Sequence, residues 1–293
     1  MRVRLRKITR HVFIYIAVFL ILIWALFPIY WIVVSSVSTR TELYSRPYKH
    51  WIPASPTLQN FTEVLSSGQK YRAGSYLPTS KLLTAGLRNS ILIAVLTAVV
   101  VTMLATMAGY VFARLKFGGK DLAFFSIMLI MPLPIWVSLI SLYFLLAQVK
   151  LTDTNLGLVL VSSTFAIPLA MWLMATFIRD IPVAIEEAAL IDGASRWGVL
   201  TRIVFPLALP GLTSVFLMTF LNTWNAFLIP LVLTNTPRSQ TITVVLSLFV
   251  GQYEVAWEHM AAATVLGIIP PLLLAFFFQR YLVRGLSMGA IKE

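Results

Sequence analysis

Residues 180–193 have types and spacing that suit a short helix able to dock on another protein. Pro182 fits the first helical turn, where its missing N–H has no partner to lose, and Asp180 can cap that turn. Glu187 lies early in the helix, where the dipole favours negative charge, and Gly193 can adopt the left-handed conformation that ends a helix. We therefore predict a helix that begins after Asp180 and ends at Gly193.

One face of this predicted helix carries one large and two small side chains at i, i+3 and i+4, namely Ile185, Ala188 and Ala189. Small side chains permit close approach of a partner, and Glu187 can pair with an Arg or Lys of that partner. The alternative is an amphipathic helix resting on lipid headgroups, which the early acidic residues disfavour. A second short helix is predicted over 196–204, ending at Pro206.

The other residues able to do chemistry form no catalytic or metal-binding set in the sequence. The chain has no cysteine, and its three histidines, His11, His50 and His259, are too widely separated to form a zinc motif. The stretch 118–121 lacks the upstream glycine and the following Ser or Thr of a phosphate-binding loop. No nucleophile pair, aspartate pair or HExxH site can be assembled within the apolar segments. We expect a non-catalytic chain without a metal or cofactor of its own.

The composition indicates a membrane protein. Of 293 residues, 59% are hydrophobic and 12% are charged, whereas soluble domains have about 45–50% apolar and about 25% charged residues. A spanning helix needs about 20 mostly apolar residues, and six windows of about that length or longer contain no charged residue. They predict an all-α membrane protein with six transmembrane helices, at 12–36, 89–113, 122–147, 157–178, 206–234 and 260–279.

The distribution of basic residues predicts that both termini are cytoplasmic. Four segments carry 14 basic residues in 60, namely 1–11, 114–121, 179–205 and 280–293. The opposite short loops, 148–156 and 235–259, carry 2 in 34. Lys and Arg concentrate in the cytoplasmic loops of membrane proteins. The net charge of +12 therefore indicates how the chain is oriented in the membrane and does not indicate nucleic-acid binding.

One membrane domain accounts for the chain. Its predicted parts are a cytoplasmic N-terminal segment (1–11), the first transmembrane helix (12–36), an external loop (37–88), a transmembrane core (89–283) that includes the loop 179–205, and a cytoplasmic tail (284–293). The external loop is rich in turn residues and holds one expected short helix near 58–66.

Six residues of the cytoplasmic loop resemble the Glu-Ala-Ala loop of bacterial ABC importer membrane subunits, whose pattern is Glu-Ala-Ala-x3-Gly-x9-Ile-x-Leu-Pro. The matching residues are Glu187, Ala188, Ala189, Gly193, Ile203 and Pro206, and only Phe205 departs, in place of Leu. The resemblance implies the ABC type I importer permease fold. It also implies that this loop is the coupling helix, which fits a cleft of the ATP-binding subunit and transmits its closure.

More narrowly, the chain resembles the carbohydrate-uptake branch and its smaller maltose-type permease subunit. The matching segments are Asn89-Ser90, Ala113-Arg114, Phe117-x-Gly119, Trp224-Asn225-x-Phe227-x-x-Pro230, Thr57-Leu58-x-Asn60-Phe61 and Gly285-Leu286-Ser287-x-Gly289-Ala290-x-Lys292. In that branch an outer loop projects toward the sugar cleft of the binding protein. The resemblance therefore implies a scoop formed by Gly251, Gln252, Tyr253 and Glu254, with a plain connecting turn as the alternative.

The fifth predicted span contains a polar group formed by Asn222, Trp224 and Asn225. Unpaired amides in lipid are costly, so these residues are expected to face inward. They either line a translocation pathway or hold helices together, and Trp224 offers a flat face suited to a sugar ring.

The resemblance implies a permease subunit that imports a sugar, expected to be an oligosaccharide, across the bacterial inner membrane. Its implied partners are a second homologous permease subunit, two ABC ATPase subunits that hold ATP and Mg, an external solute-binding protein and membrane lipid. An ion-coupled secondary carrier is the alternative, although the six spans hold no charged residue that couples ions. A membrane-embedded structural or receptor subunit without a transport path is a third possibility.

Overall fold

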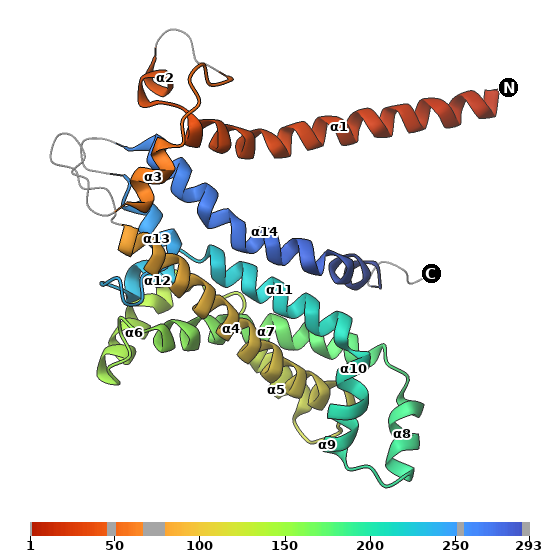
Figure 1. The fold of residues 1–293 in the computed structure, drawn as a ribbon. Helices are drawn as coiled ribbons and strands as arrows, with labels where there is room; N and C mark the ends of the chain where they lie inside the picture. The colour runs from red at the N-terminus through yellow and green to blue at the C-terminus, as the bar shows by residue number, and fades with distance from the viewer. Residues whose placement is uncertain (1, 46–50, 67–79, 251–254, 289–293) are drawn as a thin grey trace. The chain divides into compact units, whose positions relative to one another are not determined.

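The computed structural model describes residues 2–45, 51–66, 80–250 and 255–288 (Figure 1). Among these residues the regular structure is helical, with one isolated β-bridge between Val250 and Val255. The chain divides into two compact units, of which unit 1 comprises Met1–Leu83 and Leu246–Ile268 and unit 2 comprises Thr84–Val245 and Ile269–Glu293. The predicted all-α fold is confirmed.

The helices are α1 (Arg2–Val37), α2 (Arg40–Tyr44), α3 (Gln59–Leu65), α4 (Ser80–Arg114), α5 (Lys120–Met128), α6 (Ile135–Gln148) and α7 (Asn155–Arg179). They continue with α8 (Val183–Ile191), α9 (Arg196–Val199), a π-helical turn (Leu200–Val204), α10 (Phe205–Leu207), α11 (Leu209–Asn225), α12 (Leu228–Leu233), α13 (Ile242–Ser247) and α14 (Trp257–Met288). The predicted short helix near 58–66 is therefore confirmed as α3. Helices α1 and α14 extend into the predicted terminal segments, because an apolar window marks the membrane crossing and not the helix end.

The predicted number of six transmembrane helices is not reproduced among the described residues. Four helices, α1, α4, α7 and α14, are long and apolar enough to cross a membrane, and a fifth crossing results if α9 to α11, bent by 77°, count as one. The predicted span 122–147 is divided into α5 and the 14-residue α6. Pro132 and Pro134 lie between them, and each removes a backbone donor that a continuous helix needs.

In unit 1, the loop before α3 and α3 itself close the C-terminal end of α1. The side-chain amide of Asn60 donates hydrogen bonds of 2.9 Å to the backbone oxygens of both Ser36 and Ser38. The backbone N–H of Thr57 donates to Val37 O at 2.8 Å. These bonds satisfy carbonyl groups that a helix leaves without partners at its C-terminal end.

Two further contacts attach the start of α14 to the rest of unit 1. His259 Nε2 lies 2.6 Å from Glu63 Oε2 of α3, and the hydroxyl of Tyr44 donates to Val255 O at 2.6 Å. Unit 1 is thus held together by polar contacts between segments about 200 residues apart.

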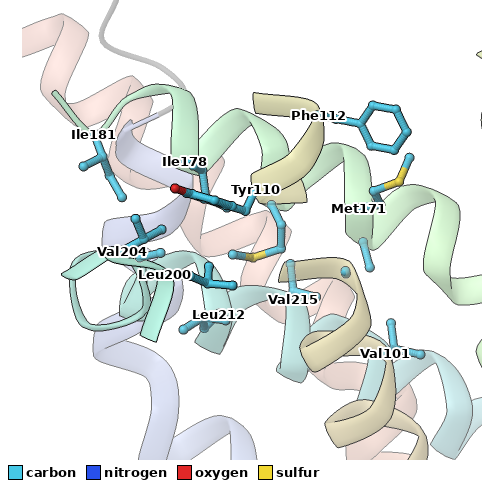
Figure 2. Packing of buried hydrophobic residues seen from close by; sticks show 14 of the residues in the cluster. Val101, Tyr110, Phe112, Met171, Ile178, Ile181, Leu200, Val204, Leu212 and Val215 are labelled. Carbon is cyan, nitrogen blue, oxygen red and sulfur yellow. The ribbon is translucent and has the colours of Figure 1, made fainter. Parts of the chain in front are cut away.

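Unit 2 has an apolar core built by α4, α7 and the segment from α9 to α11 (Figure 2). The buried residues labelled in that view are Val101, Tyr110, Phe112, Met171, Ile178, Ile181, Leu200, Val204, Leu212 and Val215. Glycines let the helices approach closely: a Cβ at Gly109 would lie 2.9 Å from Ala175 N, and one at Gly211 would lie 2.6 Å from Phe177 Cγ. Small residues at such crossings are typical of helix packing in membranes.

A carboxylate ties two loops of unit 2 together at the start of α7. Asp153 accepts hydrogen bonds from the hydroxyls of Ser239 and Thr236, both at 2.6 Å, and from the backbone N–H groups of Asn235 and Thr236. Partial burial opposes ionisation, but these donors together lower the pKa of Asp153 below its ordinary value. The ionised carboxylate is therefore the form that stabilises this junction.

Asp153→Asn should destabilise unit 2 by about 1–3 kcal/mol, because an amide cannot accept all four hydrogen bonds. Since the pKa is lowered on folding, the stabilisation is present above the ordinary Asp value of about 3.9 and is lost as the pH falls through the lower folded value. Thermal unfolding of the purified protein at neutral and acidic pH measures both effects. Asp180→Asn, at an exposed carboxylate, is the control; equal unfolding temperatures for the two variants would contradict the assignment.

Candidate functional site

Helix α8 ends as the sequence predicts but begins differently. Gly193 has φ +86°, its N–H donates to Leu190 O at 3.1 Å, and the N–H of Ala194 donates to Ala189 O at 2.9 Å, which together form a Schellman cap. The prediction that Asp180 caps the start of α8 is wrong. Asp180 is the C-cap residue of α7, and Pro182 occupies the N-cap position of α8 without a side-chain hydrogen bond.

The outward face of α8 consists of Ala184, Glu187, Ala188 and Ile191, which are spaced at i, i+3, i+4 and i+7 and are all exposed. We call these four residues the α8 surface. At 86%, Ile191 is the most exposed large hydrophobic side chain among the described residues. The predicted stripe is shifted from this face, because Ala189 is half-buried against the core of unit 2, although Ile185 is exposed.

The inward face of α8 is fastened by Arg114, the last residue of α4. Arg114 Nε lies 2.7 Å from Glu186 Oε1, and the side chains of the pair are only 9% and 5% exposed. Nη2 of the same guanidinium donates to the backbone oxygens of Ile178, at 2.7 Å, and Ile181, at 2.5 Å. The hydroxyl of Tyr110, one turn earlier in α4, interacts electrostatically with the Glu186 carboxylate.

Sequence reasoning missed this ion pair. Glu186 stands out only as the neighbour of Glu187, and its partner lies 72 residues away. The available signal was the basic residue that ends α4, next to a loop with two adjacent glutamates.

The second part of the loop differs from its prediction. The helix expected over 196–204 is α9 followed by a π-helical turn, and Pro206 does not stop it. Pro206 lies in the first turn of α10, after the wide π turn, where a residue without an N–H is tolerated. Pro206 is exposed and Ile203 is half-buried.

The polar residues of the fifth predicted span lie in the last turn of α11, just before the break that precedes α12. Asn222 and Asn225 are exposed, whereas Trp224 is 5% exposed and stacks on Phe220 with ring centroids 5.7 Å apart. The side-chain amides of Asn222 and Asn225 are thus accessible, whereas the indole of Trp224 is buried. At the break, Ala226 O accepts a hydrogen bond of 2.8 Å from the Thr243 hydroxyl.

The predicted scoop residues, Gly251, Gln252, Tyr253 and Glu254, lie outside the described residues. Within the described ranges no three His, Asp or Glu side chains come together in a way that holds a metal ion.

A family described as "Binding-protein-dependent transport system inner membrane component" matches residues 105–288. The matched segment includes α8, Arg114 at the end of α4 and the whole of α11.

Named relatives match over nearly the full chain. A sulfoquinovosyl glycerol transport system permease protein of Agrobacterium fabrum is 30% identical over 95% of this chain and 93% of its own. A trehalose/maltose transport system permease protein of Thermococcus litoralis is 31% identical over 98% of both. A trehalose transport system permease protein of Mycobacterium tuberculosis is 32% identical over 92% of this chain and 93% of its own.

Two solved structures share the fold. One is a bacterial ABC transporter involved in the import of the acidic polysaccharide alginate, with a TM-score of 0.75 at 20% identity over 92% of this chain and 95% of that chain. The other is a bacterial alginate ABC transporter in complex with an alginate pentasaccharide-bound periplasmic protein. Its TM-score is 0.64 at 16% identity, over 94% of this chain and 97% of that chain.

Substitution of Gly193 should loosen the end of α8. A Cβ at Gly193 meets no atom within 4 Å, so the cost arises from the left-handed backbone and amounts to about 1–2 kcal/mol for Gly193→Ala. Gly118→Ala is the matched control, because its Cβ also meets nothing and its φ is not positive. Amide hydrogen exchange over 188–194 should accelerate in the first variant only; unchanged exchange in Gly193→Ala would refute the cap.

Proposed function

Because the chain belongs to the family of inner-membrane components of binding-protein-dependent transport systems, we propose that it is the permease subunit of an ABC importer for an uncharged carbohydrate. The family membership is the observation that carries this proposal. It disfavours the ion-coupled secondary carrier, since members of this family work with a binding protein.

The carbohydrate substrate is supported by the names of the relatives, which include trehalose/maltose and trehalose transport permeases at 31% and 32% identity over more than nine-tenths of the chain. The residues available to a substrate agree with an uncharged ligand, because Asn222 and Asn225 present amides and no charge at the end of α11. Amides can donate to and accept from sugar hydroxyls.

The α8 surface is the proposed docking element for an ATPase subunit. Its one charge, Glu187, stands between small and apolar neighbours, which suits a helix held in a groove and paired with a basic residue of the partner. In this arrangement the chain itself is not catalytic, and ATP and Mg are held by two ATPase subunits. ATP-driven closure would move α8 and switch the bundle between inward-open and outward-open states.

The complete importer would contain a second homologous permease subunit and an external binding protein. Residues 251–254 are the proposed contact with that binding protein. Both chain termini and α8 would then lie in the cytoplasm, as the basic loops predict.

Glu187→Ala should reduce both sugar uptake and binding-protein-stimulated ATP hydrolysis by about tenfold, because a charge-assisted contact with the ATPase is lost. Proteoliposomes containing the assembled importer provide the measurement. Asp121→Asn, at an exposed carboxylate in the first turn of α5, is the control and should retain wild-type rates. Uptake that survives Glu187→Ala but collapses with a protonophore would refute the proposal in favour of ion coupling.

Asn222→Leu combined with Asn225→Leu should raise the KM for sugar uptake by about tenfold, through the loss of hydrogen bonds to the substrate. Thr176→Val is the matched control, since that hydroxyl is exposed on α7 and bonds only its own helix, at Trp172 O. An unchanged KM in the double variant would assign the two amides to helix packing.

A further inference from the structure

The inward face of α8 raises a separate question, namely how a displacement of this helix reaches the membrane-spanning helices. Between α7 and α8 the backbone link is only 180–182, so α8 is attached to α7 by three residues. Such a short link can bend, and a push on α8 alone would be absorbed there. A rigid connection between α8 and the bundle needs contacts outside the backbone.

Arg114 supplies such contacts to three segments at once. Its guanidinium bonds Glu186 on α8, Ile178 O at the end of α7 and Ile181 O in the link. Each contact is 2.7 Å or shorter, and the charged pair is almost fully buried. The planar guanidinium suits this role because Nε bonds Glu186 while Nη2 bonds the two backbone oxygens. A lysine carries all its donors on one nitrogen, which cannot occupy both positions.

The residue one turn before Arg114 also contacts both Glu186 and the core of unit 2. Tyr110, four residues earlier on the same face of α4, interacts electrostatically with Glu186 and is itself 5% exposed. Figure 2 shows Tyr110 packed among Ile178, Ile181 and Val204, with its hydroxyl directed toward the side of the cluster where Ile181 and Val204 lie. The end of α4 is thus embedded in the core of unit 2 on one side and bound to α8 on the other.

We propose that Arg114 is a positioning residue that makes the C-terminal end of α4, the end of α7 and α8 move as one rigid body. The guanidinium touches neither ATP nor sugar. It transmits to α4 the displacement that α8 receives, and this inference rests on the proposed function of α8 as the ATPase-docking helix.

The test is the number of ATP molecules hydrolysed per sugar transported, measured with the assembled importer and its binding protein in proteoliposomes. A residue needed only for folding would lower the yield of complex and leave this ratio unchanged. Arg114→Lys keeps the charge but loses the three-way contact, and should raise the ratio by about tenfold. Arg179→Met, at an exposed arginine one residue beyond Ile178, is the matched control and should leave the ratio unchanged.

Arg114→Met alone buries an unpaired Glu186 and can reduce assembly. The double variant Arg114→Met/Glu186→Met removes both charges, so the complex should assemble at the wild-type level. We expect its ratio to remain raised by about tenfold, because apolar contact does not restore the directional bonds. A wild-type ratio in both Arg114→Lys and the double variant would overturn the proposal.

A distance measurement separates this proposal from the function on which it rests. Spin labels at Leu190 on α8 and at Lys116 just beyond α4 should give a narrow distance distribution in the wild-type complex, and a broader one in the double variant. Unchanged widths would overturn the rigid connection. If Glu187→Ala impairs uptake while the Arg114 variants behave as wild type, only this inference fails; if neither affects uptake, the proposed function fails as well.

Discussion

The structure depends on one constraint, that polar groups at helix ends must find partners within a chain that lives largely in lipid. Long-range side chains meet this requirement in three places. Asn60 closes the end of α1, Asp153 ties the start of α7 to the 235–239 loop, and Arg114 binds one carbonyl oxygen at the end of α7 and one in the link to α8. Because Arg114 also binds Glu186, the same requirement fastens α8 to unit 2 and turns its opposite face toward solvent. The α8 surface is therefore exposed because the opposite face of the helix is bound to Arg114 through Glu186.

This division of α8 into two faces explains how adjacent glutamates acquire different functions. Glu186 is 4% exposed and paired, whereas Glu187 is exposed on the α8 surface. A buried ion pair contributes little net stability compared with apolar packing, but it requires a defined geometry. Here that geometry links α4, α7 and α8 within unit 2, where α8, α9 and α10 gather at one end (Figure 1). A docking helix held in this way can transmit force, while one attached only by its backbone would yield at the link.

Local sequence signals predicted much of this arrangement. Composition and apolar windows gave the all-α membrane fold, and the importer-permease resemblance is confirmed by the family and by the shared fold. The left-handed Gly193 followed from its residue type, because few other residues adopt that conformation. Predictions failed where the position of a helix end or break depends on neighbouring helices and not on the local sequence. Asp180 caps the end of α7 and not the start of α8, Pro206 is accommodated after a π turn, and prolines divide the window 122–147. The Arg114–Glu186 pair was missed because its residues lie 72 positions apart, and the basic residue at the end of α4 does not by itself identify its partner.

The central claim, that the α8 surface contacts an ATPase subunit, is tested most directly by a photo-crosslinker at Ala188. The crosslinker would be placed in the complete importer in lipid nanodiscs and irradiated with and without ATP, with a second crosslinker at the exposed Phe144 of α6 as the control. The account predicts a covalent product between position 188 and the ATPase subunit, and none from position 144. A crosslink from position 188 to lipid alone, in a complex that contains the ATPase, would contradict it.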